Sequence, residues 1–298
     1  MKLEENEKGS KKQVLLYGAA MLAVFLWASA FPATRYALDY YSPVSLMVLR
    51  FSAASITLGI VGFLMKIRLP KLKDLPLFVA SGLSGVFLYS FLFNTGSVSV
   101  SAGVSSFIIA SAPIFTLILT KIFLKEVVKP ISWLGVLISF CGLAAVTLTQ
   151  AAEFTFGIGL LLVILAAISS GIYSTVMRVL TKEYTALEAT TYTIVIGTIG
   201  TLLFLPTAIR EIPESNITVN LLVLFMGVFP AALAYLAWSY ALAKAKKTAH
   251  VTVFSYLIPF ISALLAYFWL QETISPFTFI GGVVIILGMI LTNVFDRE

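Results

Sequence analysis

The sequence predicts an all-α membrane protein whose ten transmembrane helices form two inverted five-helix repeats, with both termini in the cytoplasm. Three observations lead to this fold class. First, 59% of the 298 residues are hydrophobic and only 11% are charged, whereas soluble domains carry about 45–50% apolar and about 25% charged residues. Second, long apolar stretches follow one another with only short polar joins. Third, the second half of the chain repeats landmarks of the first.

Each apolar stretch is long enough to cross a bilayer, which takes roughly 17–25 residues in a helix. In chain order the stretches cover residues 14–34, 43–65, 75–97, 102–124, 131–149, 156–178, 187–209, 217–243, 248–270 and 276–294. The joins are short and contain prolines, which favour turns and helix starts over helix interiors. The predicted domains are a cytoplasmic N-terminal segment, two repeats and a cytoplasmic tail, at residues 1–13, 14–149, 156–294 and 295–298.

Basic residues are distributed unevenly between the two ends of the predicted helices. With the N-terminus inside, 17 Lys and Arg residues lie on the cytoplasmic side, and only Arg35 and Arg210 lie on the other. Cytoplasmic loops of membrane proteins are enriched in Lys and Arg. The bias therefore places both termini in the cytoplasm, which requires an even number of spans. The bases form no single stripe, so we do not expect nucleic acid as a partner.

The two halves of the chain match at a shift of 146 residues without a gap. Landmarks related by this shift are Tyr89 and Tyr235, Pro113 and Pro259, Glu126 and Glu272, Pro130 and Pro276, Gly135 and Gly281, and Gly142 and Gly288. A shift of 143 pairs Arg35 with Arg178. Because each half has an odd number of spans, the second half enters the membrane upside down. Folds of this kind place a substrate site between the repeats, near the middle of the bilayer.

The repeated residues have local physical roles. Pro113 and Pro259 fall within spans, where a missing N–H loosens the helix. The glycines of each half lie one heptad apart and allow helices to approach closely. The glutamates follow the last turn of a span, so we interpret them as structural markers of helix ends, with Glu126 cytoplasmic and Glu272 external. A direct functional role of either glutamate is the alternative.

This arrangement resembles the drug/metabolite transporter superfamily, specifically its EamA-type ten-helix exporters. Each half closes with the pattern Pro…Leu-x-Glu-x-x-x-Pro…Gly, and the stretch FLWASAFPATRYAL at residues 25–38 resembles the first helix of the family, with Trp27 and Arg35 in the expected places. The resemblance covers essentially the whole chain. One departure is Ser170, which stands where a tryptophan often opens the second repeat.

The resemblance implies a multi-pass carrier of the bacterial inner membrane that moves amino acids, metabolites or drugs by alternating access, generally outward. It also implies a cavity lined by the first, third, fourth, sixth, eighth and ninth spans.

Candidate binding residues are polar or aromatic side chains at membrane depth, because a substrate must exchange its water contacts for protein contacts there. We predict substrate-binding roles for Trp27, Tyr89, Asn94, Ser111, Ser170, Tyr173, Tyr235, Trp238 and Tyr256. The strongest of these are Tyr89 and Tyr235, which are repeat equivalents near span centres; ordinary helix packing is the alternative for each residue. Tyrosine or tryptophan near a span end is usually an interfacial anchor, which is how we interpret Tyr17, Tyr36, Tyr40, Tyr41, Trp133 and Trp269.

Charged and titratable residues within the spans are few. Arg50 is the only charge well inside a span, which makes it a candidate contact for a substrate carboxylate. Its structural alternatives are snorkelling outward and pairing with Asp39. His250, the only histidine, opens the ninth span and is either a solvated interfacial residue or a proton carrier. The interior of the spans contains no Asp or Glu, which favours facilitated diffusion over ion coupling.

The sequence thus predicts a transporter and not an enzyme: an exporter of small neutral or zwitterionic metabolites such as amino acids. A multidrug or dye exporter of the same superfamily is the first alternative, and a non-transporting membrane sensor or scaffold is an alternative of a different class. A single histidine and no acid within the spans leave no catalytic constellation, and we expect no cofactor and no metal site. The expected partners are a small-molecule substrate and the lipid bilayer, with the chain as a monomer or a homodimer.

Overall fold

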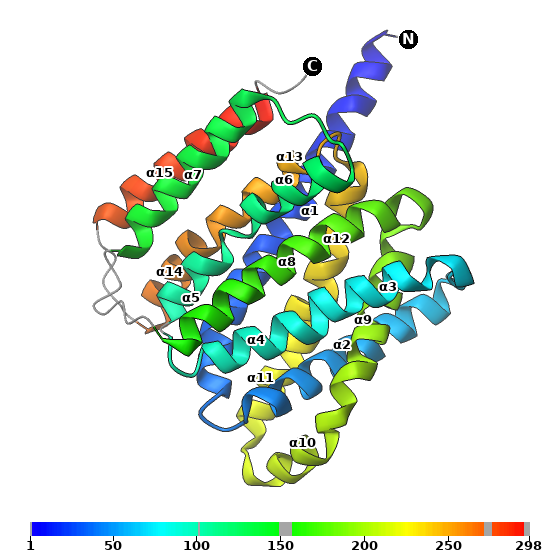
Figure 1. The fold of residues 1–298 in the computed structure, drawn as a ribbon, viewed down its shortest axis with the longest axis vertical. Helices are drawn as coiled ribbons and strands as arrows, with labels where there is room; N and C mark the ends of the chain where they lie inside the picture. Colours follow the sequence, from blue (N-terminus) through cyan, green and yellow to red (C-terminus); the bar gives the residue numbers. More distant parts are fainter. Residues whose placement is uncertain (1, 101, 149–156, 271–275, 295–298) are drawn as a thin grey trace.

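The structure, a computed structural model, describes residues 2–100, 102–148, 157–270 and 276–294. Helices and short connections account for all of these residues, and no strand occurs among them. Most helices lie side by side in one bundle, and α7 (Pro130–Leu148) and α15 (Pro276–Val294) form a pair along one flank of it (Figure 1). Glu272, the predicted external partner of Glu126, lies outside the described residues.

The first half of the chain contains three uninterrupted helices and two spans that change character along their length. Its elements are α1 (Lys2–Ala37), α2 (Pro43–Leu64), η1 (Leu72–Asp74), α3 (Leu75–Gly82), η2 (Leu83–Leu88), α4 (Tyr89–Gly96), α5 (Ala102–Ile109), α6 (Ala112–Phe123) and α7. The third predicted span is α3, η2 and α4 in direct succession, with η2 a π-helical turn. Helix α2 begins with proline after Ser42, whose hydroxyl caps the backbone N–H of Ser45, as expected for a helix N-terminus.

The second half repeats this organisation. Its elements are α8 (Ile158–Glu183), α9 (Ala186–Thr201), η3 (Leu202–Phe204), α10 (Leu205–Glu211), η4 (Ile212–Glu214), α11 (Ile217–Met226), η5 (Gly227–Leu233), α12 (Ala234–Lys244), α13 (Ala249–Thr252), η6 (Val253–Tyr256), α14 (Leu257–Leu270) and α15. The eighth predicted span is α11, η5 and α12, again with a π-helical turn in its middle. Helix α9 begins with a capping box between Thr185 and Glu188.

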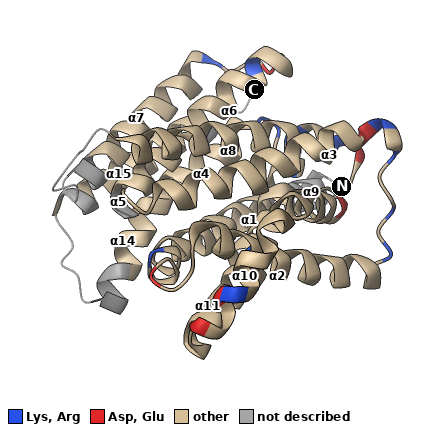
Figure 2. Ribbon diagram, turned by 60° about the horizontal axis from the view of Figure 1, so that its bottom comes forward, with Lys and Arg blue, Asp and Glu red and all other residues tan. Residues whose placement is uncertain are grey.

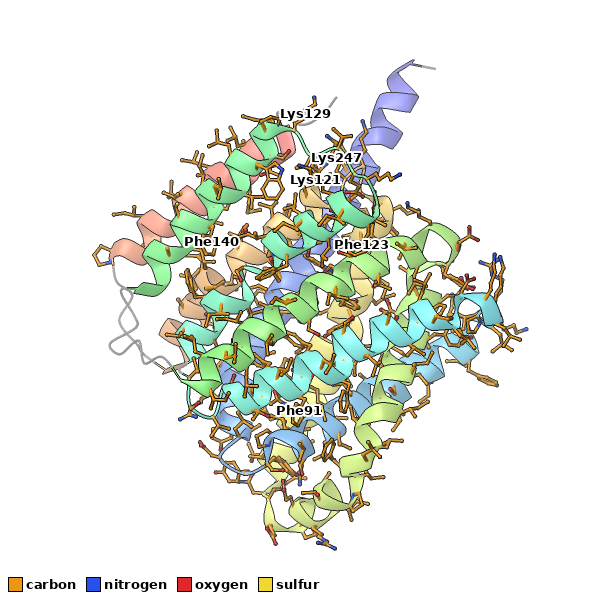
Figure 3. The ribbon with its side chains drawn as sticks, in the orientation of Figure 1. Phe91, Lys121, Phe123, Lys129, Phe140 and Lys247 are labelled. Carbon is orange, nitrogen blue, oxygen red and sulfur yellow. The ribbon has the colours of Figure 1, made fainter. Side chains whose placement is uncertain are left out.

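Seven helices within the described residues are long and apolar enough to cross a membrane. Three shorter apolar helices, Pro130–Ala144, Ala249–Leu265 and Phe279–Thr292, coincide with the fifth, ninth and tenth predicted spans. The number of ten spans stays a prediction. Charged residues gather mainly at the ends of the helices (Figure 2), and large apolar side chains such as Phe123 are exposed on the outside (Figure 3).

The prolines shared by the two halves shape the helices as the sequence indicates. Pro113 lies in the first turn of α6, just after the break that separates α5 from α6. Pro259 lies in the first turn of α14, just after the 3-10 turn η6. Both interruptions follow from the backbone N–H that proline lacks. Pro130 and Pro276 are the first residues of α7 and α15, where proline costs nothing.

The glycines of α7 and α15 show how the two halves are related. A Cβ added to Gly142 would lie 2.7 Å from the carbonyl oxygen of Gly281, and a Cβ added to Gly135 would lie 2.7 Å from that of Gly288. The contacts are reciprocal, because Gly135 is the repeat equivalent of Gly281 and Gly142 that of Gly288. The predicted close approach at these glycines is confirmed, and the partner of each is on the equivalent helix of the other half.

Between the two glycine contacts, α7 and α15 meet at equivalent positions. Ser139 Oγ donates to the carbonyl of Ile285 at 3.1 Å, and the two residues are 146 positions apart. Reciprocal contacts around a self-equivalent point are the signature of a two-fold axis. The two helices therefore run antiparallel across a pseudo-two-fold axis, and the second half of the chain is inverted relative to the first.

We call the side of the bundle where α2 ends and α3 begins the proximal end. The opposite side, where α1 ends and α2 begins, is the distal end. Lys121, Lys129 and Lys247 lie near one another toward the proximal end (Figure 3). The two ends correspond to the predicted cytoplasmic and external sides of the membrane, respectively.

Candidate functional site

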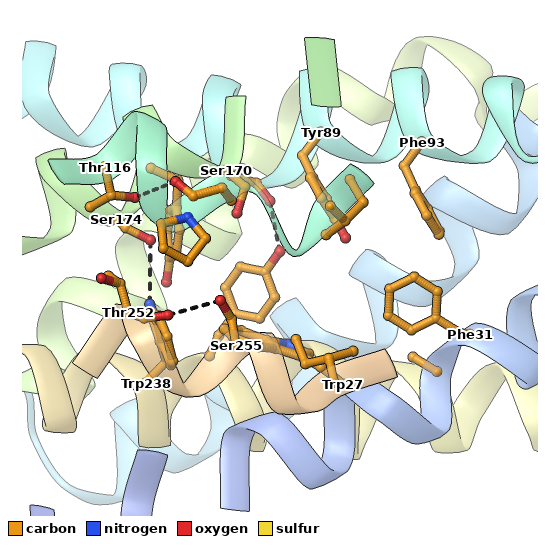
Figure 4. Close-up of a pocket in the computed structure, with 18 of the residues that line it drawn as sticks. Trp27, Phe31, Tyr89, Phe93, Thr116, Ser170, Ser174, Trp238, Thr252 and Ser255 are labelled. Atoms are coloured by element: carbon orange, nitrogen blue, oxygen red, sulfur yellow. Dashed lines mark hydrogen bonds between the residues drawn. The ribbon is translucent and has the colours of Figure 1, made fainter. Parts of the chain in front are cut away.

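A pocket lies in the middle of the bundle, between the two halves (Figure 4). Its walls come from α1, η2, α4, α5 and α6 of the first half and from α8, α12, α13, η6 and α14 of the second. These elements belong to the first, third, fourth, sixth, eighth and ninth spans, the six that the resemblance implies. The second span adds one residue, Arg50. Among the described residues, α7, α9 and α15 contribute nothing to the lining.

Aromatic rings form one side of the pocket. The ring of Trp27 lies 5.0 Å from that of Trp238 and 5.6 Å from that of Tyr235, between centroids, and is nearly perpendicular to the latter. The ring of Tyr235 also lies 5.2 Å from that of Tyr173. Edge-on and tilted arrangements at these separations are favourable for aromatic pairs. The rings come from α1, α8 and α12, so the cluster joins the two halves as well as lining the pocket.

Two π-helical turns present carbonyl groups to this aromatic cluster. The Tyr235 hydroxyl donates to the carbonyl of Gly85 in η2 at 2.8 Å, and Trp27 Nε1 donates to the carbonyl of Pro230 in η5 at 3.1 Å. A π turn widens the helix and is frequent at functional sites; in η5 the proline also removes a backbone donor. Glycine is needed at position 85, because a Cβ there would overlap the ring of Tyr173.

Arg50 is the only charged side chain among the described residues that line the pocket. It is 6% exposed, and its guanidinium carbon lies 5.4 Å from the centroid of the Phe51 ring. In the part of the chain that the structure describes, no carboxylate pairs with it and its Nε has no hydrogen-bond partner. Snorkelling and pairing with Asp39 are therefore both wrong. An unpaired cation at membrane depth is costly, and its planar fork of donors suits a carboxylate.

Small hydroxyl side chains line much of the remaining wall. The hydroxyl of Thr116 donates to a carbonyl of its own turn at 3.0 Å, and that of Ser255 donates to the carbonyl of Thr252 at 2.8 Å. The side-chain hydroxyls of Thr34 and Thr252 are buried without a hydrogen-bond partner among the described residues. Because buried polar groups normally have partners, these two hydroxyls are available to a bound molecule.

The structure brings most of the predicted site residues together. The pocket is lined by Trp27, Tyr89, Ser170, Tyr173, Tyr235, Trp238 and Arg50. Tyr89 and Phe93 project from α4, and Trp27 and Phe31 lie on the opposite wall, formed by α1 (Figure 4). Tyr89 and Tyr235 thus line one pocket from opposite halves. That any of these residues binds substrate stays a prediction.

Four predicted residues lie outside the pocket. Asn94 donates its side-chain amide to the carbonyl of Pro43 at 3.0 Å and so ties α4 to the start of α2. The hydroxyl of Ser111 bonds within the bend between α5 and α6. Tyr256 is fully buried with its ring edge-on to a phenylalanine of α7. His250 is buried in α13, beyond the pocket toward the proximal end.

The sequence interpretation also missed residues that line the pocket. Phe31 and Thr34 follow Trp27 at spacings of four and seven residues, which put them on the same face of α1. Thr252 and Ser255 are three residues apart just before the proline of the ninth span. Helical spacing from an identified residue was the available signal for both pairs.

Glu126 joins the two halves at the proximal end. Its carboxylate accepts hydrogen bonds from Arg178 Nε at 3.3 Å, from the backbone N–H of Thr248 at 3.1 Å and from the Thr248 hydroxyl at 3.0 Å. Arg178 also donates to the carbonyl of Lys246 at 3.0 Å. The preceding residue, Lys125, has a positive φ of 53°, a turn that commonly ends helices. Glu126 thus connects the α6–α7 join to α8 and α13.

A second polar cluster joins the halves at the distal end. Tyr41 is only 2% exposed, and its hydroxyl bonds to Ser215 Oγ at 2.8 Å and to the side-chain oxygen of Asn220. The backbone N–H of Ser42 donates to Glu211 at 2.8 Å. The interpretation of Tyr41 as an interfacial anchor is therefore wrong, because its polar tip is bound by the other half of the protein and not by the membrane surface.

Comparison with known proteins identifies the family. The model of the EamA-like transporter family matches the chain twice, over residues 15–148 and 157–294. The transporter YdfC of Bacillus subtilis is 34% identical over 283 residues, which cover 95% of this chain and 92% of YdfC. A probable terminal-alkyne amino-acid exporter of Streptantibioticus cattleyicolor is 32% identical over 275 residues, which cover 92% of each chain.

More distant similarity agrees with this. A transporter of Archaeoglobus fulgidus is 33% identical over 270 residues, which cover 90% of this chain and 95% of that protein. A crystal structure with 19% sequence identity has the same fold, with a TM-score of 0.77 over 94% of this chain and 97% of the other. The chain is a multi-pass membrane transporter of the drug/metabolite transporter superfamily and belongs to the EamA-like transporter family.

Proposed function

We propose that the chain exports small neutral or zwitterionic metabolites such as amino acids, by alternating access around the central pocket. The observation that carries this proposal is Arg50, a buried cation that lines the pocket and has no carboxylate partner among the described residues. The Streptantibioticus relative, named a probable amino-acid exporter, supports the same substrate class. The proposal includes ten spans, both termini in the cytoplasm, and a bacterial inner membrane.

The pocket offers complementary groups to both ends of an amino acid. The guanidinium of Arg50 pairs with the carboxylate, which also offsets the cost of the buried charge. No acidic side chain lines the pocket within the described residues, so the ammonium group meets the faces of Trp27 and Trp238, where cation–π contacts contribute about 0.5–2 kcal/mol. The unpartnered hydroxyls of Thr34 and Thr252 accept or donate further hydrogen bonds.

A drug or dye exporter is the second candidate, because an aromatic wall suits flat apolar molecules without a carboxylate. The two functions differ in their need for Arg50. The decisive experiment uses the purified protein in liposomes and compares counterflow of labelled amino acids, their methyl esters and a cationic dye. We expect transport of the acids and not of the esters, and a loss of at least tenfold in Arg50→Gln. Dye transport that is unchanged in Arg50→Gln would overturn the proposal in favour of the second candidate.

The orientation is tested by labelling single cysteines in a Cys141→Ser background. Cysteines are placed at Glu214, in η4 at the distal end, and at Lys182, in the last turn of α8 at the proximal end. An impermeant thiol reagent added to whole cells should modify the first and spare the second. The opposite labelling pattern would reverse the proposed topology.

Transport should not need a proton gradient. No carboxylate among the described residues lines the pocket, and His250 lies outside it, so no identified group carries a proton together with the substrate. In liposomes, the internal substrate concentration should rise only to the external one, and collapsing the gradient with an ionophore should leave this final level unchanged. If accumulation collapses with the gradient, His250→Ala becomes the test for the carrier of the proton.

A further inference from the structure

The two π-helical turns make one pair of contacts that follows the pseudo-two-fold symmetry. Trp27 Nε1 of α1 donates to the carbonyl of Pro230 in η5 at 3.1 Å. Ser169 Oγ of α8 donates to the carbonyl of Ser84 in η2 at 2.8 Å. Ser84 and Pro230 are equivalent at the 146-residue shift, and Ser169 is one residue from Ser170, the equivalent of Trp27. The first helix of each half therefore donates a hydrogen bond to a carbonyl of the other half, and the two carbonyls are repeat equivalents.

A second pair of contacts at the same turns is only half made. The Tyr235 hydroxyl, just after η5, donates to the carbonyl of Gly85 in η2 at 2.8 Å. The repeat equivalents of these residues are Tyr89, just after η2, and Ala231 in η5. The side-chain hydroxyl of Tyr89 makes no hydrogen bond within the described part of the chain. The Tyr89 ring lies parallel to that of Phe93, 5.7 Å away between centroids, and lines the pocket. The two halves thus share one fold but differ in this hydrogen bond.

We propose that Tyr89 and Tyr235 exchange this hydrogen bond when the transporter changes state. In the state described here Tyr235 is bonded to Gly85 and Tyr89 is free. In the opposite state Tyr89 bonds to the carbonyl of Ala231 and Tyr235 is released. The inference rests on the alternating access of the proposed function. In an inverted repeat, the opposite state is reached when the two halves swap their conformations about a fixed site. A bond that exists in only one state contributes directly to the balance between states.

The exchange also has a consequence for the substrate. Arg50, Tyr89 and Tyr235 all line the same pocket. Whichever tyrosine is free therefore offers its hydroxyl to the pocket that Arg50 also lines. A substrate carboxylate then meets the guanidinium and one phenol in each state, which makes the two tyrosines alternating positioning residues for transport.

The test removes one hydroxyl at a time and measures the populations of the two states without substrate. Pairs of spin labels are attached at Val127 and Lys244 for the proximal end, and at Tyr40 and Ile217 for the distal end, in a Cys141→Ser background. These positions are exposed, so the labels leave the core intact. Pulsed dipolar spectroscopy of the full-length protein in nanodiscs then gives the share of molecules with the label distances of this structure.

Tyr235→Phe should lower the share of this state relative to the other by about fivefold, and Tyr89→Phe should raise it by about fivefold, the effect of one ordinary hydrogen bond. The double variant should return close to the wild-type balance, because each state then lacks its own bond. Tyr256→Phe is the matched control: its hydroxyl is buried without a hydrogen-bond partner among the described residues and lies outside the pocket, so its loss should leave the balance unchanged.

Shifts of Tyr89→Phe and Tyr235→Phe in the same direction would overturn the exchange, as would shifts no larger than that of Tyr256→Phe. A double variant that stays far from the wild-type balance would also overturn it. The measurement needs no substrate, so it is independent of the substrate class. If the protein does not transport amino acids but the two variants still shift the balance in opposite directions, the exchange stands and only the proposed substrate class is wrong. If every variant shows a single set of spin-label distances, alternating access itself is refuted.

Discussion

Replacing Arg50 by methionine should make the protein more stable and less active at once. An arginine near the centre of a membrane span costs about 2.5–3.5 kcal/mol relative to water. In the structure the only compensation recorded for its guanidinium among the described residues is the face of Phe51 at 5.4 Å, and such a contact returns about 0.5–2 kcal/mol. Methionine has a similar length and no charge, so Arg50→Met should raise the free energy of unfolding by the difference, about 0.5–3 kcal/mol.

Thermal unfolding in detergent, followed by tryptophan fluorescence, measures the gain in stability. At about 2–4 °C per kcal/mol for a chain of a few hundred residues, the midpoint should rise by several degrees. Transport of carboxylate substrates should fall at least tenfold, and a saturating substrate should stabilise the wild type but not the variant.

Arg50→Lys is the control, since it keeps the charge but not the planar fork, and it should show no gain in stability. A midpoint that falls in Arg50→Met would refute the reasoning, because it would mean that the guanidinium has a partner that stabilises it in the folded protein.

Two further substitutions test the packing of α7 against α15 and the contacts of Glu126 at the proximal end. Gly142→Ala should destabilise the protein by about 1–3 kcal/mol, because the added Cβ would lie 2.7 Å from the carbonyl of Gly281. The control is Gly59→Ala, whose Cβ meets nothing within 4 Å and which should be neutral or stabilise the protein by up to about 1 kcal/mol. Similar thermal unfolding midpoints for the two variants would contradict the close packing of α7 and α15. Glu126→Gln should lower the stability by about 1–2 kcal/mol, because it loses the charged hydrogen bonds to Arg178 and Thr248 at the proximal end. The exposed control, Glu214→Gln, should change the stability by less than about 0.5 kcal/mol. Denaturant titration measures both, and equal losses would show that the contacts of Glu126 do not stabilise the protein.

Much of the fold could be predicted from local properties of the sequence. The apolar stretches, the prolines at helix starts and the 146-residue repeat all depend on residues close together in the chain or on a simple comparison of its halves. The heptad spacing of Gly135 and Gly142 predicted a close helix approach, and the structure identified α15 as the partner helix. The placement of Tyr89 and Tyr235 on the same pocket followed from that register as well.

The partners of polar groups, in contrast, were decided by the tertiary structure. The sequence alone left Asn94 available to a substrate and Tyr41 at the membrane surface, and in the structure they bond to Pro43 and Asn220, 51 and 179 residues away. The sequence also allowed Arg50 to snorkel outward or to pair with Asp39, and in the structure Arg50 is buried without an ionic partner among the described residues. A hydrogen bond depends on which helix faces a side chain and on the position along that helix that it faces. Hydrophobic periodicity gives information about neither. By itself the sequence therefore determined which segments are apolar enough to enter a membrane and which residues are equivalent. Only the packing of the two halves decided which polar groups have hydrogen-bond partners and which remain free to bind.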